Sequence, residues 1–204
     1  MFMSKLYAIT DSQLMPGQLL FDGVNAALQG GCRLVQYRDK SGDAVKRRQE
    51  AEGLLEICHY HGARLIINDD PLLAKAIGAH GVHLGQTDGD ARAARQLLGP
   101  EAMLGVTCHA SLEFARQALA DGASYIAFGR FFPSQTKPDA PPAPLSLISE
   151  AATRYPDTQV VAIGGITLDN AATITEAGAH YVAVSHALFN APDIRWQAEQ
   201  FSRL

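Results

Sequence analysis

The stretch Leu34-Val35-Gln36-Tyr37-Arg38 is a short apolar run that ends in polar and charged side chains. Eight runs of this kind recur along the 204 residues, and most of them end in a polar or charged residue. The other seven occupy residues 6–10, 65–69, 82–85, 103–107, 125–129, 160–165 and 181–185. Continuous apolar runs of this length are typical of strands buried on both faces, as in a parallel sheet.

Segments with helical periodicity separate these runs. Residues 17–31 carry apolar side chains at helical spacings and end at Gly30-Gly31, a stop signal. Further helices are expected at residues 43–62, 71–79, 90–98, 111–121, 144–155, 168–177 and 193–203. The alternation predicts parallel strands joined by right-handed crossovers. Eight units in a chain of this size favour a single domain, residues 1–204, folded as a closed (β/α)₈ TIM barrel rather than an open sheet.

Composition excludes several classes of protein. The net charge of −4 provides no basic field that would attract nucleic acid. No apolar stretch approaches the roughly 20 residues that span a bilayer, so no membrane partner is expected. Residues 1–5 lead straight into the first run, which predicts a cytoplasmic protein without a signal peptide. Solvent-facing barrel helices often support dimers, so a homodimer stays open.

The three cysteines, Cys32, Cys58 and Cys108, lack CxxC spacing and cannot all pair. We expect three reduced, buried thiols. The alternative is a metal site built from Cys58, His59 and His61. Their position late in an amphipathic helix favours surface residues for the two histidines.

The second run supplies candidate phosphate ligands. Side chains two apart in a strand point to the same side, so Gln36 and Arg38 should face the mouth of the barrel, with Lys40 just beyond. An arginine fork and a lysine point charge together suit a phosphate or pyrophosphate. The alternative is a solvated turn in which Arg38 and Lys40 pair with Asp39 or Asp43.

Acidic residues follow the third and fourth runs. Asp69 and Asp88 stand at neighbouring strand ends, where two carboxylates could share Mg²⁺, a cation that prefers oxygen ligands and often bridges to substrate phosphates. The alternative is helix capping. Asp70 fits capping well because it precedes Pro71, and Asp88 could cap the next helix.

The last two runs predict a second anion site. The seventh leads into Gly164-Gly165 and the eighth ends at Val184-Ser185, and loops after these strands form the recurrent phosphate site of TIM barrels. Paired glycines let backbone N–H groups approach an anion closely.

Residues 130–144 form a long Pro-rich segment after the sixth run, which could act as a lid. It carries Ser134, Gln135, Thr136 and Lys137, and Thr107 ends the fifth run. His83 and His109 lie near strand ends, and a hydrogen-bonded structural role is the favoured interpretation of His83. No Ser-His-Asp or Cys-His arrangement is convincing. The inventory suits electrostatic handling of two phosphorylated ligands rather than acyl transfer.

Five motifs in order resemble the thiamine phosphate synthase family over almost the whole chain. They lie at residues 36–40, 65–69, 81–88, 136–139 and 162–166. The resemblance implies a TIM barrel that joins a hydroxymethylpyrimidine diphosphate to a thiazole phosphate and releases pyrophosphate. That reaction is dissociative: a pyrimidine methylene cation forms before the thiazole nitrogen attacks.

The resemblance also implies roles for particular residues. Gln36 to Lys40, Tyr37 and Asp39 included, and Asn68 would hold the pyrimidine diphosphate. Asp69 and Asp88 would ligate Mg²⁺. Thr107 and Lys137 would contact the pyrimidine or the departing pyrophosphate, so that Arg38, Lys40, Thr107 and Lys137 are the candidate catalytic residues. The thiazole phosphate would lie against Ser134, Gln135, Thr136, Gly165, Val184 and Ser185.

Two positions depart from the family pattern. The family commonly has Ser where this chain has Thr107, and Thr-x-Thr-Lys where it has Ser134-Gln135-Thr136-Lys137; the hydroxyl donors persist in both. Three alternatives remain open: a thiazole tautomerase of the same fold, a non-catalytic barrel that binds thiamine precursors, and a sugar-phosphate epimerase or aldolase. An aldolase would need a Schiff-base lysine inside a strand, and none of the eight runs contains one.

Overall fold

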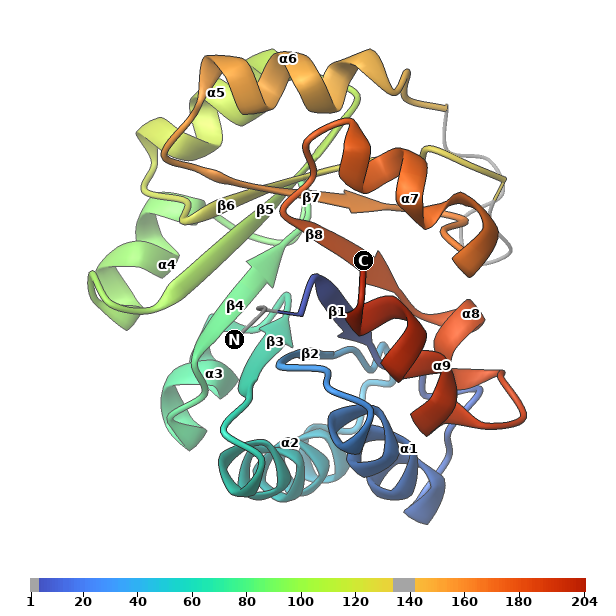
Figure 1. The fold of residues 1–204 in the computed structure, drawn as a ribbon. Helices are drawn as coiled ribbons and strands as arrows, with labels where there is room; N and C mark the ends of the chain where they lie inside the picture. The colour runs from blue at the N-terminus through green and yellow to red at the C-terminus, as the bar shows by residue number, and fades with distance from the viewer. Residues whose placement is uncertain (1–3, 134–141) are drawn as a thin grey trace.

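The computed structural model describes residues 4–133 and 142–204. Eight parallel strands close into a barrel in chain order, β1 to β8, which confirms the predicted fold (Figure 1). The strands are β1 (Leu6–Ile9), β2 (Leu34–Tyr37), β3 (Arg64–Asn68), β4 (Gly81–Leu84), β5 (Met103–His109), β6 (Tyr125–Phe128), β7 (Gln159–Ile163) and β8 (Tyr181–Val184). β8 pairs with β1, for example Ala8 with Val184, and this pairing closes the barrel.

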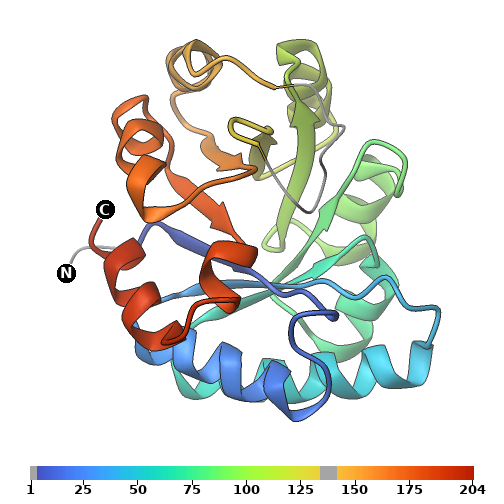
Figure 2. The same ribbon diagram turned by 90° about the vertical axis from the view of Figure 1, so that its right-hand side faces the viewer.

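Helices form an outer ring around the strands (Figure 2). They are α1 (Gln18–Gln29), α2 (Ala44–Tyr60), α3 (Pro71–Ile77), α4 (Ala91–Leu98), α5 (Leu112–Ala120), α6 (Ser146–Arg154), α7 (Leu168–Glu176), α8 (His186–Phe189) and α9 (Ile194–Ser202). The short helix α8 is not predicted from the sequence. One turn is too short to produce a periodic pattern.

Side-chain caps fix several helix starts. Asp70 accepts from the backbone N–H of Leu73, which confirms its capping role before Pro71. α4 is capped by Asp90, whose carboxylate accepts from Arg92 and Ala93. The alternative that Asp88 caps this helix is therefore wrong, and the Asp88 carboxylate is available for another task.

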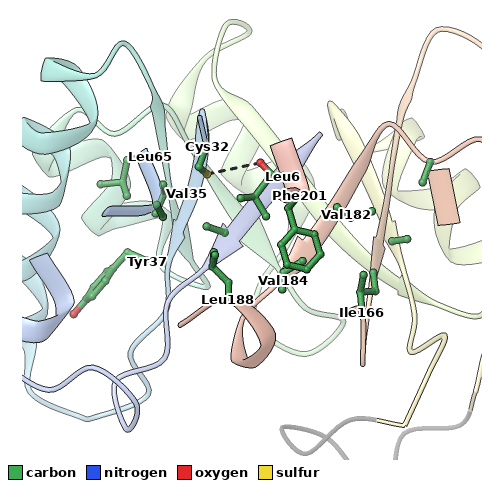
Figure 3. Close-up of a cluster of buried hydrophobic side chains, with 14 of the residues drawn as sticks. Leu6, Cys32, Val35, Tyr37, Leu65, Ile166, Val182, Val184, Leu188 and Phe201 are labelled. Carbon is green, nitrogen blue, oxygen red and sulfur yellow. Dashed lines mark hydrogen bonds between the residues drawn. The ribbon is translucent and has the colours of Figure 1, made fainter. Parts of the chain in front are cut away.

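Alternation along each strand divides the core into two layers. In β1, Leu6 and Ala8 face the helices, whereas Tyr7 and Ile9 face the barrel axis. The inner cluster contains Tyr7, Ile9, Leu34, Ile66, Tyr125, Ala127, Val161 and Ala183. In the outer cluster, Phe201 of α9 packs near Leu6, Val182 and Val184 (Figure 3). The inner side chains fill the barrel, so a cavity can form only at its mouth.

The three cysteines are free and buried, as predicted. Burial raises the pKa of Cys32 to about 11, so its thiol stays protonated and unreactive. His61 contacts the Asn25 side chain at 2.8 Å instead of joining Cys58. Among the residues that the structure describes, no group of three or more His, Cys, Asp or Glu side chains could hold a metal ion, and no helix is long and apolar enough to cross a membrane.

Candidate active site

A cavity of about 340 Å³ opens at the carboxyl ends of the strands, and residues from all eight strands line it. Seven residues predicted from the sequence meet there: Gln36, Arg38, Asn68, Thr107, Gly165, Val184 and Ser185. They come from the ends of β2, β3, β5 and β8 and from the turn after β7. The convergence follows from parallel strands, whose carboxyl ends all lie on one face of the barrel.

Tyr37 and Asp39 do not line this cavity. The alternation that points Gln36 and Arg38 inward sends these two side chains outward, toward α2. The Tyr37 hydroxyl donates to the Glu50 carboxylate at 2.6 Å, and Tyr37 belongs to the outer cluster (Figure 3). Asp39 accepts from the Lys46 ammonium at 2.6 Å and from the backbone N–H of Ser41 at 2.5 Å. The loop that carries Lys40 is therefore anchored to helix α2 by Tyr37 and Asp39.

Lys40 reaches across to the two acidic residues. Its ammonium forms an ion pair with the Asp69 carboxylate and lies 3.8 Å from an oxygen of Asp88. The Lys40 side chain is about half exposed, and the two carboxylates are more shielded. Because a single cationic group approaches both carboxylates, this part of the rim can hold a cation between the ends of β3 and β4.

Asp69 adopts a left-handed backbone conformation, with a φ of 62°. This conformation is uncommon for residues other than glycine and is found at functional sites that hold a side chain in place. The backbone N–H of Asp69 donates to the His83 carbonyl at 2.8 Å, and the Asn68 amide donates to the Asp69 carboxylate at 2.6 Å. These contacts fix the direction of the Asp69 carboxylate.

The glycine turn after β7 forms the opposite wall of the cavity. The loop after β6 packs on this turn, since the N–H of Phe132 donates to the Gly164 carbonyl at 3.0 Å. Gly165 has a φ of 66°, and a Cβ there would collide with the carbonyl oxygen of Pro133. Only glycine lets the two loops approach so closely, and the turn stays open to the cavity beside Val184 and Ser185.

Several cavity residues are not predicted from the sequence. Thr10, Asp11 and Arg130 line the cavity, and the Thr10 hydroxyl accepts from the backbone N–H of Arg38 at 2.8 Å. Thr10 could have been found from its place at the end of the first run. Tyr7 also lines the cavity and is almost fully buried. Its inward position follows from alternation along β1, the same signal that predicts the inward positions of Gln36 and Arg38 in β2.

His83 faces inward from β4, and among the described residues its ring nitrogens lie 3.0 Å from the Tyr125 hydroxyl and 2.8 Å from the Thr107 hydroxyl. The expectation of a hydrogen-bonded histidine is therefore confirmed. Ser134, Gln135, Thr136 and Lys137 lie outside the described residues, so their predicted contacts stay predictions.

A closed (β/α)₈ barrel whose mouth carries an arginine, a shared acidic pair and a glycine turn belongs to the class of barrel enzymes that act on small phosphorylated molecules. The family described as thiamine monophosphate synthase matches residues 6–188. Thiamine-phosphate synthase of Saccharophagus degradans is 52% identical over 195 residues, which cover 95% of this chain and 89% of that protein.

Solved structures of other proteins have the same fold as this chain. Thiamine phosphate pyrophosphorylase from Pyrococcus furiosus superposes with a TM-score of 0.89 at 31% identity, covering 99% of this chain and 95% of that one. A structure described as native KDPGal has a TM-score of 0.75 at 19% identity over 97% of this chain and 92% of that one, a likeness of fold alone. The chain thus belongs to the thiamine monophosphate synthase family. Its function is that of a thiamine-phosphate synthase, a transferase of thiamine biosynthesis.

Proposed function

We propose that the protein condenses 4-amino-2-methyl-5-hydroxymethylpyrimidine diphosphate with 4-methyl-5-(2-hydroxyethyl)thiazole phosphate, or its carboxylated form, and releases pyrophosphate with the help of Mg²⁺. The observation that carries this proposal is the pairing of Asp69 and Asp88 with one cationic group beside a cavity lined by Gln36, Arg38 and Asn68. A diphosphate with a divalent cation needs both features side by side.

The acidic pair fits Mg²⁺. Both ligands are hard oxygen donors, and Lys40 already places a positive charge between them. Two carboxylates leave most of an octahedral shell to water and phosphate oxygens, which is the usual arrangement for Mg²⁺ in phosphate-handling enzymes. When bound, the ion would neutralise charge on the diphosphate.

Cationic side chains would assist departure of pyrophosphate. Arg38 faces the cavity and offers a bidentate fork, and Lys40 stands at the rim. Negative charge grows on the leaving group as the bond to the pyrimidine methylene breaks, so fixed cations stabilise the transition state more than the ground state. Lys137 is proposed to add a third positive charge from the Pro-rich segment.

The second substrate would lie against the glycine turn. Gly165, Val184 and Ser185 share one wall of the cavity, and we propose that they bind the thiazole phosphate. Thr107 lies two residues before the end of β5 and would contact the pyrimidine or its leaving group. A pyrimidine methylene cation attacked by the thiazole nitrogen requires no protein nucleophile. The three buried cysteines, whose thiols burial keeps protonated, agree with such a mechanism.

A thiazole tautomerase of the same fold is the closest alternative. Isomerisation of one thiazole phosphate would not need Arg38, Lys40 and the acidic pair, and their arrangement here favours the synthase. A precursor-binding protein without catalysis would bind both substrates but release no pyrophosphate.

The test is a reconstitution with omissions. Purified protein is mixed with both phosphorylated precursors and Mg²⁺, and thiamine phosphate is detected by mass while pyrophosphate is assayed separately. We expect both products only when every component is present. Product formed with EDTA in place of Mg²⁺ would refute the metal requirement, and binding without product would refute the synthase assignment.

A further inference from the structure

A row of side-chain hydrogen bonds crosses the barrel interior beneath the cavity. The Gln36 amide donates to the Tyr7 hydroxyl at 2.8 Å, and the hydroxyls of Tyr7 and Tyr125 lie 2.8 Å apart. The Tyr125 hydroxyl lies 3.0 Å from Nδ1 of His83, whose Nε2 lies 2.8 Å from the Thr107 hydroxyl. These five residues come from β2, β1, β6, β4 and β5, and we call them the Gln36–Thr107 relay.

The polar groups of the relay are buried, so each of them needs a hydrogen-bond partner within the protein. Tyr7 and Tyr125 are each 1% exposed, and Gln36 is 2% exposed. A buried polar hydrogen without an acceptor is costly, so each proton in the relay needs a partner. Burial also raises the pKa of both tyrosines well above 10, so each hydroxyl keeps one proton to donate.

The Gln36 amide at one end of the relay determines which group donates in each hydrogen bond. An amide NH₂ can only donate, so the Tyr7 oxygen accepts from Gln36. If Tyr7 then donates to Tyr125, and Tyr125 donates to Nδ1 of His83, every proton has an acceptor. The opposite direction would leave the Tyr7 proton without a side-chain acceptor among residues 4–133 and 142–204.

The His83 tautomer follows from this direction. Nδ1 accepts a hydrogen bond, so a neutral imidazole carries its proton on Nε2 and donates it to the Thr107 oxygen. The Thr107 hydroxyl is then the last member of the row, and its own proton is directed to a group outside the relay. Thr107 lines the cavity, so a ligand atom bound there can accept this proton.

We propose that His83 is a positioning residue, fixed in its Nε2–H tautomer by the relay, which makes the Thr107 hydroxyl a hydrogen-bond donor to the bound ligand. The inference rests on the proposed function, since the acceptor is taken to be an atom of the pyrimidine diphosphate. It predicts that the cavity selects an acceptor, a phosphate oxygen or a ring nitrogen, at this point and rejects a donor.

The packing of the aromatic rings holds the side chains of the relay in place. A Cβ at Gly105 would collide with the Tyr125 ring, so glycine makes the space that this ring occupies. The Tyr125 ring stacks on His83 with centroids 5.6 Å apart and meets the Tyr7 ring edge-on at 6.0 Å. Three locked rings leave little freedom to the hydroxyls between them.

The direct test measures the tautomer in the unaltered protein. Nitrogen-15 NMR of the imidazole side chains, with His83 assigned through His83→Gln, distinguishes a protonated Nε2 from a protonated Nδ1. We expect the proton on Nε2. A proton on Nδ1 would overturn the proposal, because Thr107 would then donate to His83. The variant Gln36→Glu replaces the terminal donor with an acceptor, and we expect it to move the proton to Nδ1; an unchanged tautomer would refute control by Gln36.

A double-mutant cycle tests the link to turnover. Tyr125 does not line the cavity, so Tyr125→Phe removes one relay hydroxyl and keeps the ring. We expect kcat to fall about tenfold with little change in KM, the size of one lost hydrogen bond. In a Thr107→Val background the same change should have no further effect, whereas in a Thr107→Ser background its effect should return.

Additive effects of Tyr125→Phe and Thr107→Val on kcat would assign Tyr125 a merely structural role and refute the proposal. Tyr155→Phe is the matched control, because the buried Tyr155 hydroxyl has no hydrogen-bond partner among the described residues; the change should leave kcat unchanged. The NMR measurement needs no turnover, so a protonated Nε2 in a protein without synthase activity would refute the proposed function and leave the relay standing.

Discussion

The ammonium of Lys40 forms an ion pair with the carboxylate of Asp69, although the two residues follow different strands of the barrel. β2 and β3 are neighbours, so a loop residue after the first can reach the end of the second. The pair joins the proposed diphosphate site to the proposed metal site. It also means that a metal ion and the lysine would compete for the same carboxylate.

Removing one carboxylate should weaken the response to Mg²⁺. For Asp69→Asn or Asp88→Asn we expect the affinity for Mg²⁺ to fall on the order of 10²-fold or more, because an amide oxygen carries no charge. The activity is measured as a function of Mg²⁺ concentration. Asp70→Asn is the matched control: it removes the same charge one residue away and keeps a good helix cap. An unchanged Mg²⁺ requirement in Asp69→Asn would contradict the assignment.

Removing the lysine should have opposite effects on metal binding and turnover. Lys40→Met keeps the length of the stem and leaves Asp69 and Asp88 without their shared cation. We expect Mg²⁺ to bind about five- to tenfold more tightly without substrate, given one unit charge several ångströms away in a solvated site. Turnover should nevertheless fall, because a charge that faces the leaving group is lost. Calorimetry and steady-state kinetics check the two halves, and weaker Mg²⁺ binding would count against competition.

The guanidinium of Arg38 should matter through its shape as well as its charge. Arg38→Lys keeps the charge and loses the bidentate fork, so we expect kcat/KM for the pyrimidine diphosphate to fall about tenfold. The KM for the thiazole phosphate should change little, because Gly165 and Ser185 follow β7 and β8, whereas Arg38 follows β2. Arg116→Lys, in an exposed ion pair with Glu113, is the control. Equal losses for both substrates would place Arg38 elsewhere in the mechanism.

The glycine turn should be sensitive to a single methyl group. Gly165→Ala would drive a Cβ into the Pro133 carbonyl and push the loop after β6 away. We expect the KM for the thiazole phosphate to rise about tenfold or more, since small displacements of binding groups are costly. Gly62→Ala is matched in backbone conformation, with a φ of 62° against 66°, but its Cβ would meet nothing. It should cost about 1–2 kcal/mol of stability and leave KM unchanged.

Asp39 should make stability depend on pH on the acid side. Burial pushes its pKa up, but hydrogen bonds from Lys46 and Ser41 outweigh this and lower the pKa below 3.8. Because the pKa of Asp39 is lower in the folded protein than in the unfolded chain, its negative charge stabilises the fold at pH values above the pKa of the unfolded chain. This stabilisation is lost as the pH falls through the pKa of the folded protein. Near neutral pH we expect Asp39→Asn to cost about 2 kcal/mol, the size of a hydrogen bond to a charged group.

The prediction for Asp39 is checked by measuring the melting temperatures of the unaltered protein and of Asp39→Asn between pH 2 and pH 7. The difference between them should be constant above about pH 5 and should shrink below about pH 4. A difference that stays the same down to pH 2 would show that the Asp39 charge does not contribute to stability.

Much of the site was predictable because strand alternation and strand ends are local features. The run 34–38 alone indicates that Gln36 and Arg38 share a side, and the structure places both at the cavity. The same rule, applied consistently, would have sent Tyr37 and Asp39 outward and Tyr7 inward. Tyr37 and Asp39 are predicted as contact residues because the whole motif is interpreted as lining the site. Only alternate members of the motif face the site.

Other features could not be read from the chain. Asp88 and Asp90 are both candidates for the cap of α4, and only the course of the loop decides that Asp90 takes this role. The Gln36–Thr107 relay joins five strands, so no local pattern announces it. α8 is a single turn and is formed where β8 meets the helical layer.

The sequence by itself determined the barrel, its eight units and the set of residues at the strand ends, because periodicity and alternation are properties of neighbouring residues. Only the tertiary structure decided which of these residues meet: Lys40 with Asp69, Asp39 with Lys46, and Tyr125 with Tyr7 and His83. These contacts join different elements of the barrel. They depend on the register and closure of the strands and on the packing of α2, which are set by the whole core at once.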